Sequence, residues 1–314
     1  MKILVTGAAG FIGSHLAERL AKDGHDVLGI DSFSKYYDPR LKEINVASVR
    51  ESGAKVIKLD LAKDDLEESV DGVEIIYHFA AQPGISENVP FADYETNNLT
   101  ATHRLLEAAK AESSLKMFVN ISTSSVYGKY VSGDENVPPA PASYYGVTKL
   151  AAEQLALSYF REKGMPVCSA RLFSVYGERE RPEKLYPKLI KSIAEDKEFT
   201  LYEGSGDHKR SYTYVGDIVE GLVRIIGNPQ VNGQIFNLGT ETSITTGEGI
   251  RTIEEIMGKK AKIVSAPRRA GDQMETRASI EKAKILLGYE PKTPVKEGLR
   301  REVEWYLREV HGKI

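Results

Sequence analysis

The chain has 314 residues, which is long enough for one large domain or for two smaller domains that share an interface. With 41% hydrophobic and 28% charged residues it has the composition of a soluble globular protein, and its net charge of -3 argues against a nucleic-acid or membrane partner. Its one cysteine, Cys168, excludes an internal disulfide framework and a cysteine-based zinc site, no metal is expected, and the lack of a signal peptide or membrane-spanning run predicts a cytoplasmic protein.

The first predicted strand, 2–6, runs directly into a turn with three glycines, Gly7, Gly10 and Gly13, at the start of a helix. The first glycine permits a tight turn, the second lets the backbone approach a pyrophosphate, and the third brings helix and strand close together. Asp31, at the end of the second predicted strand, can hydrogen-bond the adenine ribose and repel a 2′-phosphate. We therefore predict a site for NAD, with NADP as the alternative because Lys35 is nearby.

Apolar runs at 26–30, 55–59, 74–79, 116–121 and 166–173 continue the series of strands, and helical periodicity fills several of the intervals between them. Strands that are apolar throughout and alternate with helices form a parallel sheet that is covered on both faces. The sequence thus predicts an α/β fold, with a doubly wound, Rossmann-type parallel sheet over residues 1–174.

A candidate acid-base pair lies in SYYGVTK (143–149), where Tyr145 and Lys149 are four residues apart and so share one face of a helix. A tyrosine, with an ordinary pKa of about 10, becomes a useful base when a nearby ammonium and a positive nicotinamide ring favour the phenolate. It can then take the proton of an alcohol whose carbon gives up hydride. Tyr159 and Lys163 have the same spacing, but they lie roughly 21 Å further along the helix, away from the strand ends where ligands bind.

Beyond residue 175 the alternation of strands and helices breaks into shorter pieces. Helices are predicted near 183–196, 217–227, 247–257, 279–287 and 295–310, and short strands near 199–202 and 234–238. We expect a smaller C-terminal α/β lobe, 175–314, that folds over the ligand edge of the sheet and binds the substrate, with some segments crossing between the two parts.

These features together resemble the extended short-chain dehydrogenases/reductases, in particular the NAD-dependent nucleotide-sugar epimerase/dehydratase family. The similarity runs nearly end to end and is carried by the glycine turn, Asp31, LDL (59–61), HFAAQ (78–82), NNL (97–99), TSSVYG (123–128), YGVTK (145–149), RSYTYVGDI (210–218) and RRAGDQ (268–273). The resemblance implies that NAD is bound tightly and recycled, in contact with Gly7, Gly10, Phe11, Ile12, Gly13, Asp31, Ser32, Lys35, Asp60, Leu61, Phe79, Ala80, Ala81, Gln82, Asn98, Tyr145, Lys149 and Phe173. It makes Thr123, Tyr145 and Lys149 the catalytic residues, and it assigns the nucleotide's diphosphate and ribose to Arg210, Arg269 and Asp272.

The two residues that follow the active-site threonine limit the reactions that can be expected of this chain. A 4,6-dehydratase of this family has Asp-Glu there, and the related UDP-glucuronate decarboxylases usually keep a Glu, whereas this chain has Ser124 and Ser125. The reaction that remains is oxidation and re-reduction at one carbon, which is epimerisation. The segment RPEKLYP (181–187), however, is dehydratase-like. The resemblance thus implies an isomerase that abstracts hydride at C4 of a UDP-sugar, lets the 4-keto intermediate rotate and returns the hydride.

Two departures from the UDP-galactose/glucose epimerase pattern bear on the substrate. Ser174, in RLFSVYG (171–177), stands where those enzymes usually have asparagine, and Arg181 follows shortly afterwards. With Ser124 and Ser125 these residues resemble the carboxylate pocket of UDP-glucuronate 4-epimerases, which favours conversion of UDP-glucuronate to UDP-galacturonate. A UDP-glucose/UDP-galactose or UDP-N-acetylhexosamine epimerase is the alternative, and Arg181 could instead be a loop charge paired with a nearby glutamate.

A homodimer is also expected, because two long predicted helices near 92–111 and 144–163 carry more apolar residues than one sheet face needs. Relatives pair these helices into a four-helix bundle. A dehydratase, an oxidoreductase that releases NADH and a non-catalytic NAD-sensing regulator are the other functions considered. The intact Thr-Tyr-Lys set argues against the regulator, because a sensor has no use for a tuned phenolate.

Overall fold

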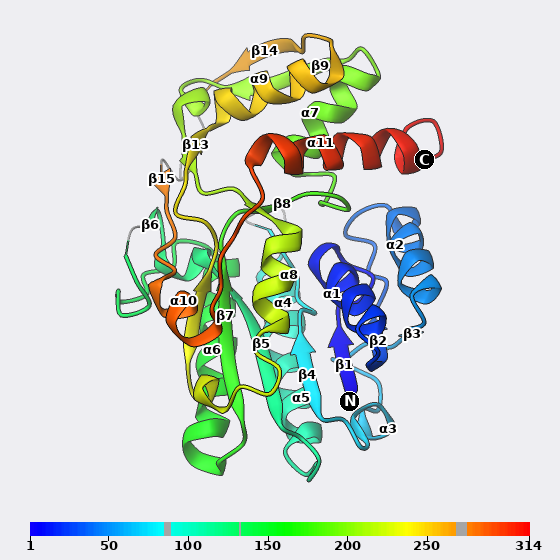
Figure 1. The fold of residues 1–314 in the computed structure, drawn as a ribbon, viewed down its shortest axis with the longest axis vertical. Helices are drawn as coiled ribbons and strands as arrows, with labels where there is room; N and C mark the ends of the chain where they lie inside the picture. The colour runs from blue at the N-terminus through cyan, green and yellow to red at the C-terminus, as the bar shows by residue number, and fades with distance from the viewer. Residues whose placement is uncertain (85–88, 132, 268–274) are drawn as a thin grey trace.

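The protein is described by a computed structural model that covers residues 1–84, 89–131, 133–267 and 275–314. Its centre is a parallel sheet of seven strands in the order β12-β7-β5-β4-β1-β2-β3 (Figure 1). The strands are β1 (Lys2–Thr6), β2 (Asp26–Asp31), β3 (Lys55–Lys58), β4 (Ile75–His78), β5 (Met117–Thr123), β7 (Val167–Leu172) and β12 (Ile235–Leu238). Because the order reverses at β1 and β4, the sheet is doubly wound, as the sequence predicted.

The strands are apolar throughout because the sheet is buried on both faces. Alternate residues of β1 point to opposite sides, so that Ile3 and Val5 belong to one core cluster and Leu4 to the other. The first cluster packs under α1 (Phe11–Lys22), α2 (Pro39–Glu51) and α8 (Val215–Val223). The second lies under α3 (Glu67–Val70), α5 (Ala101–Ala109) and α6 (Tyr144–Lys163).

The other elements lie mostly above the carboxyl ends of the strands, at the top of Figure 1. The helices there are α7 (Leu185–Ala194), α9 (Thr246–Met257) and α11 (Val295–Trp305), beside the paired strands β9 (Glu198–Tyr202) and β14 (Lys262–Ala266). Two small sheets join these helices to the body, one of β13 (Ile244–Thr245), β10 (Lys209–Arg210), β15 (Glu275–Thr276) and β6 (Tyr130–Val131), the other of β8 (Val175–Tyr176) and β11 (Thr213–Tyr214). The remaining helices are α4 (Phe91–Tyr94), which continues through a π-helical turn at Glu95–Thr100 into α5, and α10 (Glu281–Leu287).

Two segments from the second half of the chain return to the central sheet. Strand β12 pairs with β7 at the edge, and helix α8 packs against α1. The lobe and the sheet therefore share a continuous core. Among the residues that the structure describes, no helix is both long and apolar enough to cross a membrane.

Candidate active site

The turn that leaves β1 is shaped by two of its glycines. Gly7 has a φ of +72°, a conformation that favours glycine, and its amide donates to the carbonyl of Ile30 over 2.7 Å. A side chain at Gly13 would overlap the carbonyl oxygen of Gly7, so helix α1 can lie against the turn only because position 13 has no Cβ. No side chain caps α1 at Gly10, which leaves the first amides of the helix available to an anion.

Asp31 lies buried at the end of β2 and faces this turn. Its carboxylate accepts from the amide of Ala9 over 3.1 Å and from the amide of Phe33 over 2.8 Å. The cation beside it is Lys42 of α2, whose Nζ lies 3.4 Å from Oδ1. The sequence pointed instead to Lys35, which lines a neighbouring hollow. Sequence periodicity does not predict α2, and for that reason the buried Lys42 was missed.

One cavity of about 470 Å³ extends from the glycine turn to the C-terminal lobe. It contains most of the residues predicted for cofactor and substrate: Gly7, Gly10, Phe11, Ile12, Gly13, Asp31, Ser32, Asp60, Leu61, Phe79, Ala80, Ala81, Gln82, Thr123, Ser124, Ser125, Tyr145, Lys149, Ser174, Arg181 and Arg210. Arg269 and Asp272, which were also predicted to bind substrate, lie outside the described residues. Within the described part of the chain, no group of three or more His, Cys, Asp or Glu residues is arranged to hold a metal ion.

Two predicted cofactor residues lie behind the cavity wall rather than in it. Asn98 is buried, accepts from the amide of Gln82 over 2.7 Å and donates to the hydroxyl of Thr148 over 2.9 Å. Phe173 is buried with its ring 6.1 Å from that of Tyr127. Asn98 therefore supports the cavity-lining Gln82, and Phe173 belongs to the core.

Tyr145 lies in the first turn of α6, which Ser143 caps by accepting from the amide of Gly146 over 3.1 Å. Gly146 allows this turn to approach the end of β5, since a Cβ there would lie only 2.7 Å from the carbonyl oxygen of Ser125. Thr123 is the last residue of β5, and its side chain hydrogen-bonds that of Tyr145. The tyrosine and the threonine predicted to act on one hydroxyl group are thus neighbours.

Arg181 adds a charge to this site that the sequence analysis did not connect with Tyr145. Burial raises the pKa of Tyr145, and the positive charge of Arg181 opposes this rise. Burial lowers the pKa of Lys149 to about 8, against the opposing effect of Glu153. Burial and the charge of Lys149 lower the pKa of His78 to about 3. Lys149 therefore interacts electrostatically with His78 and Glu153, within the body of the sheet.

The second tyrosine with a lysine four residues later has a different environment. The hydroxyl of Tyr159 donates to Glu107, and neither Tyr159 nor Lys163 lines the cavity. The helical spacing alone does not separate the two pairs, whereas the position at the start of α6 does.

Arg181 lies between β8 and α7 and lines the cavity together with Ser124, Ser125 and Ser174. Its Nη1 also forms an ion pair of 2.7 Å with Glu183. Arg181 is thus both a loop charge paired with a glutamate and a part of the cavity wall. A guanidinium carries five N–H donors, so this ion pair leaves donors for a second anion.

Comparison with known proteins agrees with this geometry. The sequence matches the NAD dependent epimerase/dehydratase family over residues 3–239, which is more than half of its length. The chain belongs to this family. The UDP-glucose epimerase YtcB of Bacillus subtilis, which is described as uncharacterized, is 42% identical over 97% of this chain and 98% of its own.

Two further members of the family share the whole length of the chain. UDP-glucuronate 4-epimerase 3 of Arabidopsis thaliana is 33% identical over 99% of this chain and 77% of its own. The crystal structure of a UDP-glucuronic acid 4-epimerase from Bacillus cereus, in complex with UDP-glucuronic acid and NAD, is 38% identical with a TM-score of 0.92 over 97% of this chain and 98% of that one. These matches confirm the predicted fold and the predicted resemblance to epimerases.

The epimerase fold brings two further charged residues to the cavity that the sequence analysis missed. Glu180 and Lys184 line it beside Arg181. The carboxyl group of Glu180 lies near that of Glu302 in α11; burial raises the pKa of Glu180 to about 8 and raises that of Glu302 well above its ordinary value. No sequence signal connects the two glutamates, since they are distant in the chain and meet only when α11 folds onto the lobe.

Proposed function

We propose that this chain is an NAD-dependent UDP-sugar 4-epimerase that converts UDP-glucuronate to UDP-galacturonate. The observation that carries the proposal is a single cavity shared by the glycine turn, the Thr123–Tyr145 pair and Arg181. It combines a dinucleotide site, an acid-base group and a cation for a sugar acid. The relatives named UDP-glucuronate 4-epimerase, and the Bacillus cereus enzyme solved with UDP-glucuronic acid and NAD, support the assignment.

The residues present fit NAD. The turn at Gly7 and Gly13 is a cradle that any Cβ would fill, and it opens onto the uncapped amides of α1. Asp31 offers a carboxylate at the strand end where the adenine ribose binds in this fold, and its charge disfavours a 2′-phosphate. Bound NAD supplies an acceptor and donor of hydride for the sugar carbon.

The acid-base work falls to Tyr145. Its phenolate takes the proton of the sugar 4-hydroxyl and returns it after the 4-keto sugar has rotated to present its other face. Thr123 hydrogen-bonds Tyr145 and so fixes the hydroxyl that reacts. Lys149, buried on the same helix face, provides a positive charge for the phenolate once water is excluded from the filled cavity.

The substrate carboxylate is assigned to Arg181 and the hydroxyl groups of Ser124, Ser125 and Ser174. Oxidation at C4 produces a β-keto acid, which loses carbon dioxide when its carboxylate stands perpendicular to the carbonyl plane. Donors that hold the carboxylate out of that orientation protect the intermediate while it rotates.

Proton NMR of the purified protein tests this assignment. UDP-glucuronate, UDP-glucose and UDP-N-acetylglucosamine are supplied in turn, without added NAD. We expect UDP-galacturonate to appear from UDP-glucuronate at a constant NADH absorbance, because the cofactor is recycled. Turnover of UDP-glucose alone would favour the alternative that the Bacillus subtilis relative's name suggests, a neutral-sugar epimerase. A dehydrated product would identify a dehydratase.

We also propose that the enzyme is a homodimer that pairs α4, α5 and α6 with those of a second copy. Phe91, Tyr144 and Val147 on these helices remain 45%, 58% and 46% exposed, and the rings of Phe91 and Tyr144 are 5.3 Å apart. A cluster of exposed apolar side chains on two adjacent helices favours association. Light scattering at micromolar concentration should give twice the chain mass of 34.7 kDa, and a monomer would exclude this pairing.

The proposed location is the cytoplasm. The only cysteine, Cys168, is buried in β7, and burial raises the pKa of its thiol, so it is inert and forms no disulfide. Fractionation of cells that express the tagged protein tests this location.

A further inference from the structure

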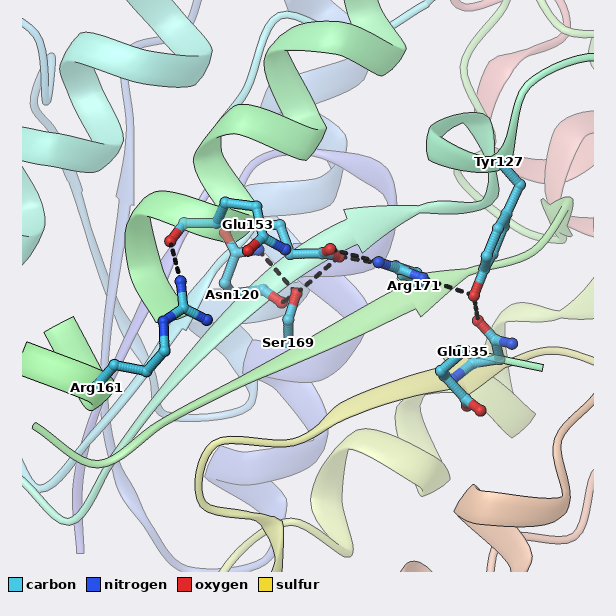
Figure 2. Close-up of polar contacts among 9 residues, drawn as sticks. Asn120, Tyr127, Glu135, Glu153, Arg161, Ser169 and Arg171 are labelled. Carbon is cyan, nitrogen blue, oxygen red and sulfur yellow. Dashed lines mark hydrogen bonds and ion pairs between the residues drawn. The ribbon is translucent and has the colours of Figure 1, made fainter. Parts of the chain in front are cut away.

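Two opposite charges lie buried in the sheet half of the molecule, outside the cavity wall. Glu153 of α6 is 0% exposed and Arg171 of β7 is 1% exposed. The Arg171 Nε and Nη2 atoms donate to the two carboxylate oxygens of Glu153 over 2.9 and 2.6 Å, and Figure 2 shows the two groups pointing toward each other between helix and strand. A buried ion pair contributes little to stability relative to apolar residues, so its presence calls for another explanation.

The pair stands next to the proposed catalytic lysine. Glu153 follows Lys149 by four residues on α6, which is about one helical turn, and Lys149 is only 3% exposed. Glu153 favours the charged form of Lys149 against the effect of burial. The other ionisable groups around Lys149 cannot do this, since Tyr145 is on its own helix but uncharged at rest, His78 on β4 is neutral and Arg171 is positive.

The same arginine also contacts the turn that carries two serines of the cavity wall. Its Nη1 donates to the hydroxyl of Tyr127 over 2.7 Å, and that hydroxyl donates to Asn237 of β12 over 2.8 Å (Figure 2). Tyr127 ends the short 3-10 turn that begins at Ser124, so Arg171 links α6, β7 and the turn that lines the cavity. Glu153 is thereby fixed on both carboxylate oxygens and cannot turn away from the helix face of Lys149.

We propose that Glu153 is a positioning residue, held by Arg171, that keeps Lys149 protonated and in place for the reaction. The inference rests on the proposed function, because it assigns Lys149 a role in that chemistry. It goes beyond that function by making the activity depend on a carboxylate that touches neither cofactor nor substrate. A purely structural ion pair would stabilise the fold without any effect on the protonation of Lys149.

Protonation of Lys149 can be measured directly in the NAD-loaded protein. NMR of lysine labelled with ¹³C at Cε follows each titration, and the Lys149 signal is assigned by its loss in Lys149→Arg. In Glu153→Gln we expect the pKa of Lys149 to fall by about one unit, since the buried carboxylate one helical turn away favours the charged form of the lysine. Glu162→Gln, which removes an exposed carboxylate from the same helix, should leave it unchanged.

A second pair of variants covers the case in which Glu153→Gln does not fold, because it leaves the guanidinium of Arg171 buried and unpaired. Glu153→Gln combined with Arg171→Met removes both charges, and Lys149 should titrate lower than in the unaltered protein but by less than in Glu153→Gln, because the loss of the positive Arg171 offsets part of the fall. Arg171→Lys keeps the carboxylate ionised, and Lys149 should titrate as in the unaltered protein. An unchanged Lys149 titration in every variant without Glu153 would overturn the inference.

The pH profile of kcat gives the second readout. The activity should decline on the alkaline side as Lys149 loses its proton, and in Glu153→Gln this decline should begin about one unit lower. The ratio of variant to unaltered kcat should then be nearest to one at low pH, a recovery that a loss of structure alone would not give. A shifted lysine titration with a profile that does not move overturns the positioning role. A protein that epimerises no UDP-sugar refutes the proposed function, while the lysine titration still decides the electrostatic link.

Discussion

The two sides of the cavity are formed by different kinds of chemical group. The side that faces the cofactor consists largely of backbone: Gly7 and Gly13 bring chain segments into contact, and the one buried carboxylate, Asp31, is satisfied by two amides and Lys42. The side that faces the substrate is lined by charged side chains, including Glu180 and Arg181. The cofactor side should therefore be sensitive to added side-chain volume, and the substrate side should be sensitive to a change of charge or pH.

The largest effect is expected where the two sides meet, at Tyr145. Tyr145→Phe removes the acid-base group but keeps the ring, so kcat should fall by on the order of 10³-fold while NAD stays bound. The measurement is the rate of UDP-glucuronate turnover together with the cofactor content of the purified variant. Tyr144→Phe is the matched control, since Tyr144 precedes it on the same turn but is exposed. A Tyr145→Phe enzyme that retains a tenth of the activity would show that another group carries the proton.

A single methyl group should disable the cofactor side. Gly13→Ala forces helix α1 away from the carbonyl of Gly7, which should lower the free energy of unfolding by about 1–3 kcal/mol and abolish co-purification of NAD. Gly206→Ala, in the lobe, is the control because a Cβ there meets no atom within 4 Å. Thermal melts and the absorbance of released NAD measure both effects. Equal behaviour of the two variants would mean that the turn can relax around the methyl group.

The same contrast explains how much could be predicted from the sequence. The glycine turn, Asp31 and the Tyr145–Lys149 pair are local signals, because each function depends on residues a few positions apart or at a strand end. Six of the seven strands were predicted for a similar reason, since a sheet covered on both faces must be apolar throughout, whereas β12 was predicted only as a short strand of the C-terminal lobe. Residues whose roles depend on local geometry were therefore predicted near their observed places.

The remainder depends on contacts between distant segments. Lys42 became the partner of Asp31 through a helix whose buried face includes a lysine, which periodicity cannot distinguish from an exposed one. Glu302 reached Glu180 only through the packing of α11 on the lobe. The charge on Lys149 was predicted, but its partner Glu153 was not, because nothing in the sequence separates a buried carboxylate from the exposed ones along α6.

On the substrate side, removing the positive charge of Arg181 should lower the activity on acidic sugars more than the activity on neutral ones. Truncating one partner of a charge-assisted contact costs about 2–5 kcal/mol, so Arg181→Ala should lower kcat/KM for UDP-glucuronate by roughly thirty-fold or more. The rate with a neutral UDP-hexose should fall less, because that sugar has no carboxylate for Arg181 to bind and loses only the effect of this charge on Tyr145. We also expect mass spectrometry to detect a decarboxylated 4-keto pentose, because the loosened carboxylate can reach the orientation that loses carbon dioxide.

Glu183→Gln is the matched variant, since it breaks the ion pair of Arg181 while keeping the cation. If Arg181 binds the substrate, this change should preserve the activity on UDP-glucuronate. If Arg181 only holds its loop, both variants should lose activity on acidic and neutral sugars alike, and the hexuronate assignment would lose its main support.

The smallest expected effect concerns the paired carboxyl groups of Glu180 and Glu302 behind that wall. In the unfolded chain both ionise near pH 4.3, whereas burial raises the pKa of Glu180 to about 8 in the fold and raises the pKa of Glu302 well above its ordinary value. Between these values the folded protein binds more protons than the unfolded one, so its stability decreases as the pH rises.

Glu302→Gln should therefore flatten the decline of the melting temperature between pH 5 and pH 8.5. An amide in place of the carboxyl group carries no charge that would repel Glu180 when that residue loses its proton. The difference from the unaltered protein should grow with pH and reach on the order of a few degrees at the alkaline end. Glu304→Gln, on the exposed side of the same helix, should keep the original slope. If the melting temperatures of all three proteins instead fell in parallel as the pH rises, the two carboxyl groups would be hydrated and would ionise separately. The substrate side would then be no more sensitive to pH than the cofactor side.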